Sequence, residues 1–65
     1  MEFNMTNLGS ILRATRKSKR VTLKTLSEQS DVNVRTIMRM EKGQIKTIDP
    51  VLAVMDSLGL VLHIN

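Results

Sequence analysis

The chain has 65 residues, which predicts one small domain with a limited hydrophobic core. It contains no cysteine and a single histidine, His63, which excludes a disulfide framework and a conventional zinc site. Ten Lys and Arg against six Asp and Glu give a net charge of +4, which favours a polyanionic partner such as nucleic acid, with a solvated basic face as the alternative.

The remaining bulk features bear on location and on enzymatic activity. No apolar run approaches the roughly 20 residues of a membrane span, and residues 1–10 lack the basic start and apolar run of a secretion signal. We therefore expect a cytoplasmic protein with no membrane partner. Six acids, one histidine and no cysteine offer few catalytic constellations, so we expect neither an enzyme nor a bound cofactor.

A first helix is predicted after an N-terminal extension over residues 1–5. Thr6 or Asn7 can cap this helix, because both side chains offer an oxygen to the first backbone N–H groups. The helix is expected to fray near residues 18–20. Leu8, Ile11, Leu12 and Thr15 recur at the spacing of one helical face, which is expected to face the core.

A second helix is predicted over about residues 23–30, with Thr22 as its cap. Val21 and Leu26 are placed to form a hydrophobic staple at its start. Asp31 follows, and aspartate tolerates the left-handed backbone that turns a chain. The residues of this segment therefore predict a short helix that ends in a tight turn.

The third helix is predicted to begin after Asn33, a favourable cap, and to end at Gly43. Val32, Ile37 and Met40 face inward in this interpretation. Arg35, Arg39 and Lys42 then lie on the opposite side. Two helices joined by a tight turn, the second one basic on its free face, have the geometry that places a helix in the DNA major groove.

The fourth helix is predicted to run to about Leu58 and to be closed by Gly59. Thr47 can cap it with Pro50 in the first turn; alternatively, Asp49 is the cap and Pro50 the first helical residue. The expected apolar stripe consists of Ile48, Val51, Leu52, Met55 and Leu58.

Residues 60–65 predict a short C-terminal strand, because LVLHI is apolar and β-branched and follows a glycine. A lone strand leaves its backbone groups unpaired, so we expect it to pair with the same strand of a second chain across a two-fold axis. A disordered tail and a strand folded back on its own domain are the alternatives. The predicted dimerisation residues are Leu60, Val61, Leu62, His63 and Ile64.

Residues 8–59 resemble the Cro/C1-type (XRE-like) helix-turn-helix regulators, the group of the phage lambda repressor. The resemblance is carried by LGSILRATRK, by VTLKTLSEQSDVNVRTIMRMEKG and by TIDPVLAVMDSLG, in that order. It implies an all-α, lambda-repressor-like domain of four helices over residues 6–59. Asp31 stands where the family usually has glycine, and Leu23 where many members have a glutamine that touches the DNA backbone, so that contact is not transferred.

The resemblance also implies roles for individual residues. An ion pair between Arg16 and Glu41 is expected to fix the first helix against the third. Contacts with base edges are expected from Asn33, Val34, Arg35 and Arg39, and Arg35 or Arg39 could bind guanine through two hydrogen bonds. The expected phosphate contacts are Thr22, Lys24, Thr25, Thr36, Lys42 and Lys46.

These features together predict a sequence-specific double-stranded DNA-binding regulator. We expect it to act as a repressor, as a homodimer on an inverted repeat. The C-terminal strand also resembles the ending of HipB-type antitoxins, whose terminal strands pair across the dimer. An antitoxin that holds a toxin protein and represses its own operon is therefore the alternative function.

Overall fold

The computed structural model describes the backbone of residues 5–60 and the side chains of residues 7–60. This part of the chain forms four α-helices and no β-strand, which confirms the prediction of a small all-helical domain. The helices are α1 (Met5–Ser18), α2 (Leu23–Ser30), α3 (Val34–Glu41) and α4 (Asp49–Ser57). Among them, no helix combines the length and the apolar character needed to cross a bilayer.

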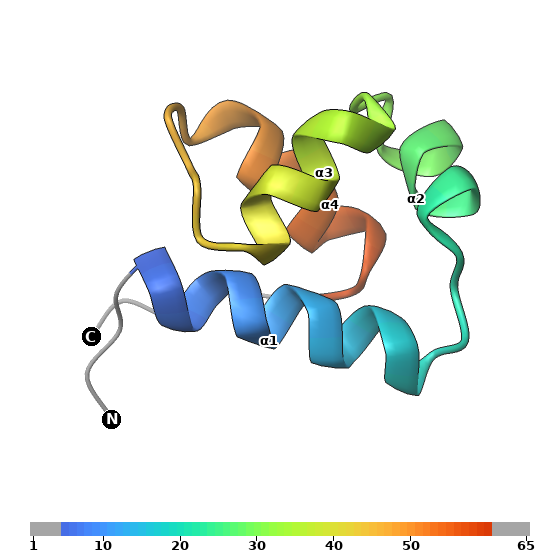
Figure 1. Ribbon diagram of the computed structural model, residues 1–65. Helices are drawn as coiled ribbons and strands as arrows, with labels where there is room; N and C mark the ends of the chain where they lie inside the picture. Colours follow the sequence, from blue (N-terminus) through green and yellow to red (C-terminus); the bar gives the residue numbers. More distant parts are fainter. Residues whose placement is uncertain (1–4, 61–65) are drawn as a thin grey trace.

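The helices enclose one hydrophobic core. Helix α1 lies along one side of the molecule, α3 packs across it, and α2 packs against both α3 and α4 (Figure 1). The most completely buried side chains, each at most 1% exposed, come from all four helices and from the residue after α4. They are Leu12, Leu26, Ile37, Val51, Val54 and Leu58.

The helix ends around α2 and α3 agree with the sequence prediction. The side chain of Thr22 accepts a hydrogen bond from the N–H of Thr25, and that of Asn33 accepts one from the N–H of Arg35. Asp31 adopts the left-handed conformation with φ 59°. Because each of these features involves residues only a few positions apart, the local sequence was sufficient to predict them.

The two outer helices differ from the prediction at their ends. Helix α1 begins at Met5, before the predicted caps at Thr6 and Asn7. Helix α4 begins at Asp49, and Ile48 precedes it without a side-chain cap. The cap position is held by Ile48, whose apolar side chain has no acceptor for the first N–H groups, so neither predicted cap forms.

The apolar stripe of α4 was predicted correctly at Val51, Met55 and Leu58, which are buried, and wrongly at Ile48 and Leu52. Ile48 and Leu52 are 48% and 45% exposed, whereas Val54 is fully buried. Helix α4 turns the side that carries Val51, Val54 and Met55 toward the core, so Ile48 and Leu52 lie at its margin. The periodicity of the sequence identified the helix but did not identify which apolar neighbours would be covered.

Helix α1 ends at Ser18, within the region where its end was predicted, and backbone hydrogen bonds close this end. The N–H of Val21 donates to the carbonyl of Arg16, and the N–H of Arg20 donates to the carbonyl of Lys17. This pattern requires the residue just before Val21 to adopt the left-handed conformation. Arg20 fills this position with φ 56°. The same bonding pattern ends α3 and α4, where the left-handed residue is a glycine, Gly43 or Gly59.

Replacing Arg20 with glycine is therefore expected to stabilise the domain. The left-handed conformation costs a residue other than glycine about 1–2 kcal/mol, part of which the more flexible unfolded glycine offsets. We expect R20G to raise the free energy of unfolding by about 1 kcal/mol, measured by urea denaturation. The matched control, K19G, changes a neighbour outside the left-handed region and should lower it; equal effects of the two variants would contradict this account.

Candidate nucleic-acid interface

Helix α3 has one buried side and one free side. Ile37 and Met40 are 0% and 2% exposed and join the core. Glu41 lies on the same side, and its side chain is only 7% exposed because it pairs with Arg16 of α1. The helix is thus held along its length by α1, α2 and α4, and its opposite side lies against none of them.

The free side of α3 carries three cations. Arg35, Arg39 and Lys42 are all exposed, and they are spaced three or four residues apart, so they are neighbours on the helix surface. Met38 lies among them and is 42% exposed. Glu41 is the one acid of α3, and it points into the ion pair with Arg16, so the free side presents uncompensated positive charge.

Asn33 and Val34 stand at the start of α3, where they were expected. The side-chain oxygen of Asn33 accepts the N–H of Arg35 at 2.8 Å, and the side chain is exposed. Capping occupies the oxygen, so the amide nitrogen is the group that Asn33 can offer to an outside acceptor. Val34 is half-buried and has only apolar atoms to offer.

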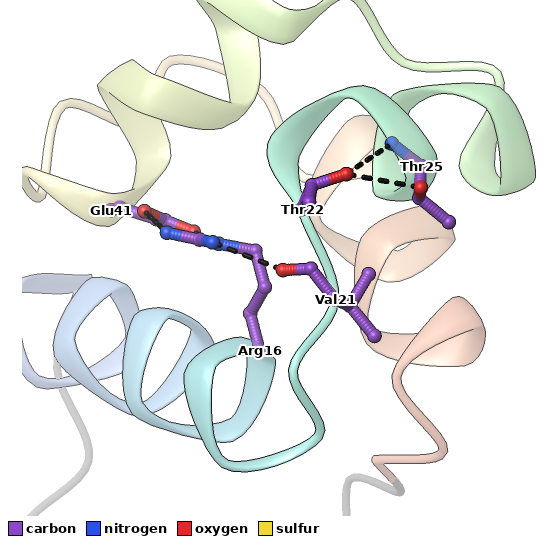
Figure 2. Close-up of polar contacts among 5 residues, drawn as sticks. All are labelled: Arg16, Val21, Thr22, Thr25 and Glu41. Atoms are coloured by element: carbon purple, nitrogen blue, oxygen red, sulfur yellow. Dashed lines mark hydrogen bonds and ion pairs between the residues drawn. The ribbon is translucent and has the colours of Figure 1, made fainter.

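The start of α2 brings together three of the residues predicted to contact phosphate. Thr22, Lys24 and Thr25 are exposed there. Thr22 donates its hydroxyl hydrogen to the Thr25 hydroxyl oxygen at 3.0 Å and accepts the Thr25 N–H at 3.1 Å (Figure 2). Since the two hydroxyl groups share one hydrogen, one hydrogen remains for an outside acceptor, at the positive end of the helix.

The other predicted phosphate contacts, Thr36, Lys42 and Lys46, line two grooves beside α3. An open groove of about 550 Å³ runs between α3 and the loop that leads to α4. Thr36 and Arg39 line it from α3, and Gln44 and Lys46 line it from the loop. Lys42 lies instead at a second, smaller groove of about 300 Å³. The hydrogen-bond donors in these two grooves could bind the phosphate groups of a long polyanion that runs along α3.

Arg16 and Glu41 form the ion pair that was expected between α1 and α3. Arg16 Nε lies 2.7 Å from Glu41 Oε2, and Arg16 Nη2 lies 3.1 Å from Oε1 (Figure 2). The third guanidinium nitrogen, Nη1, donates to the carbonyl of Val21 at 3.1 Å. One arginine therefore binds the end of α3 and the α1–α2 connection at the same time, which fixes the position of α3.

The environment of the ion pair favours the charged arginine. Hydrogen bonding to Glu41 raises the pKa of Arg16 above its ordinary value, with a smaller opposing effect of burial. A pKa that is higher in the folded state than in the unfolded state stabilises the fold at every pH below the unfolded-state pKa. This stabilisation is lost only as the pH rises through the folded-state pKa. Because both values lie at strongly alkaline pH, Arg16 adds no pH dependence to stability near neutrality.

The predicted dimerisation residues are only partly described. Leu60 is half-buried and packs against the core of its own chain, and its N–H donates to the carbonyl of Met55. Leu60 therefore belongs to the end of α4 rather than to an extended strand. The other four predicted residues, 61–64, lie outside the described residues, so pairing between two chains stays a prediction.

Two side chains of this surface, Met38 and Gln44, were not predicted from the sequence. Met38 lies three residues after Arg35 and four before Lys42, a spacing that could have placed it on the free side of α3. Gln44 follows Gly43 and lines the larger groove beside Arg39. Gln44 could not be predicted from the sequence, because its place depends on how the loop folds back after the helix.

The residues on and around α3 thus form a cationic surface on a rigid support. Its donors are exposed, and an ion pair and core contacts hold the helix that carries most of them. No family model and no curated protein matches this sequence, so these residues and their geometry are the basis for assigning a function.

Proposed function

We propose that this protein is a sequence-specific double-stranded DNA-binding regulator of the Cro/C1 (XRE-like) helix-turn-helix type. In this proposal α2, the turn at Asp31 and α3 are the helix-turn-helix, and α3 enters the major groove. The observation that carries the proposal is the orientation of α3, with Arg35, Arg39 and Lys42 exposed opposite its buried side.

The chemistry of the exposed groups supports separate roles in binding. Arg35 and Arg39 have the forked donor geometry that matches O6 and N7 of guanine, so we assign them to base edges. Lys42, Lys24 and Lys46 carry flexible point charges suited to phosphate. The hydroxyl groups of Thr22 and Thr25 would bind the same backbone strand at the start of α2.

We further propose that the protein binds as a homodimer to an inverted repeat and represses transcription. One domain offers a single α3 and a small contact area, and a two-fold dimer doubles both. The half-sites would lie about 10 base pairs, or a multiple of this, apart. Analytical ultracentrifugation with and without DNA tests the dimer, and a monomer on a single half-site would contradict it.

The roles of Arg35 and Lys42 can be separated by mutation. DNA sites selected from a random pool by the wild-type protein provide the specific ligand, and scrambled versions provide the reference. We expect R35A to lose about 1–3 kcal/mol of binding free energy for the selected site and to relax specificity at one position. K42A should weaken binding to both DNAs alike and lower the slope of log affinity against log salt by about one.

Lys19 provides the matched control for the loss of one positive charge. Its ammonium group lies beside Gly59 at the end of α4, and we assign it no contact with DNA. We expect K19A to change neither the preference for the selected site nor, by more than about 0.5 kcal/mol, the folding stability. Failure of the wild-type protein to enrich any sequence, or identical behaviour of R35A and K19A, would reject the proposed interface.

A further inference from the structure

The exposed methionine on α3, Met38, is not among the residues assigned to base edges or to phosphate. Met38 is one of three large apolar side chains in residues 7–60 that are strongly exposed, and it is the one that lies on α3. Arg35 precedes it by three residues and Lys42 follows it by four, so it stands among the cations of the free side. It is not among the partly buried apolar residues that pack against the core.

The surroundings of Met38 restrict what it can bind. Met38 lines the smaller groove together with Leu23 of α2. Arg13 and Lys42 supply positive charge at the same groove, where the Glu41 carboxylate is paired with Arg16. A thioether donates no hydrogen bond and accepts only weakly, so it gains little from phosphate or from the polar edges of guanine and adenine. The ligand group that best suits Met38 is therefore an apolar group carried by a negatively charged molecule.

In the major groove, the C5-methyl group of thymine is such a group. We infer that Met38 is a specificity-determining residue that contacts the C5-methyl group of a thymine in the bound site. This inference rests on the proposed DNA binding and adds to it a defined base feature. Cytosine carries the same group only when it is methylated at C5, so 5-methylcytosine is the second possible source.

The helix geometry also predicts where this thymine lies. Arg35 and Met38 are separated by about 4.5 Å along the axis of α3, since each residue adds about 1.5 Å. Successive base pairs are about 3.4 Å apart. The thymine should therefore lie within about two base pairs of the guanine that Arg35 binds.

The test removes single methyl groups from the DNA. Each thymine of the selected site is replaced in turn by uracil, which differs only at C5, and the affinity is measured by fluorescence anisotropy. In each half-site we expect one of these single replacements to lower the affinity of the wild-type protein about fourfold. This factor corresponds to the free energy gained by burying one methyl-sized group. M38A should bind the thymine and uracil sites equally, while L52A, which shortens an exposed apolar side chain of α4, should keep the fourfold difference.

A second arm methylates each cytosine of the selected site at C5. A gain of affinity that M38A abolishes, together with no effect of uracil, would assign the contact to 5-methylcytosine and overturn the thymine assignment. Uracil replacements without effect on the wild-type protein, or a uracil effect that persists in M38A, would also overturn it while leaving DNA binding intact. Failure to enrich any DNA would instead reject the proposed function together with this inference.

Discussion

Truncating Glu41 to alanine is expected to remove a large part of the folding stability of this domain. The change leaves the Arg16 guanidinium without its carboxylate partner at a part-buried site, where the arginine side chain is 11% exposed. Breaking a fully buried ion pair costs about 3–5 kcal/mol. Because water still reaches part of this pair, we expect E41A to cost the lower end of this range, about 3 kcal/mol. A domain of this size has a total stability of roughly 3–10 kcal/mol. Urea denaturation followed by circular dichroism measures the loss.

Two further variants separate the ion pair from general effects of mutation. E28A removes an exposed acid from α2 and should change the stability by less than about 0.5 kcal/mol. The double variant R16M/E41M replaces both charges with apolar side chains of similar length, and it should recover much of the loss because no buried charge remains. Equal stabilities of E41A and E28A would show that the pair does not hold α1 against α3.

Replacing Gly9 with alanine is expected to destabilise the protein, although the same change in the middle of an ordinary helix stabilises by about 0.5–1 kcal/mol. A Cβ atom at Gly9 would lie well inside contact distance of the Met40 carbonyl oxygen, and 3.0 Å from the Gly43 nitrogen. Both are backbone atoms at the end of α3 and cannot rotate away. Overpacking of this kind costs about 1–3 kcal/mol, so G9A should lower the free energy of unfolding measured in urea.

The neighbouring residue provides the control for this prediction. Ser10 is exposed on α1, so S10A adds helix propensity without a steric conflict and should stabilise slightly, by a few tenths of a kcal/mol. G9A should also weaken DNA binding, since it pushes α1 away from the end of the helix that carries Lys42. An increase in stability for both G9A and S10A would mean that α1 and α3 do not approach closely at Gly9.

Much of the segment from α2 to α3 could be predicted from its residues. The caps at Thr22 and Asn33 and the left-handed turn at Asp31 were all expected, and each depends on bonds between residues close together in the chain. The exposure of Arg35 and Arg39 followed from the same helical periodicity that buried Ile37. The ion pair of Arg16 with Glu41 was expected by resemblance to a family, because the spacing of two distant charges cannot predict that they meet.

By itself, the sequence determined the α2–turn–α3 unit and the cationic side of α3, because local hydrogen bonds and one helical period are sufficient to specify them. Three features depend on how the helices pack: Gly9 touches the backbone at the end of α3, Val54 rather than Leu52 is buried, and Met38 is exposed among the cations. These features depend on where one helix lies against another. That arrangement results from packing between residues far apart in the chain, which neither propensity nor periodicity encodes.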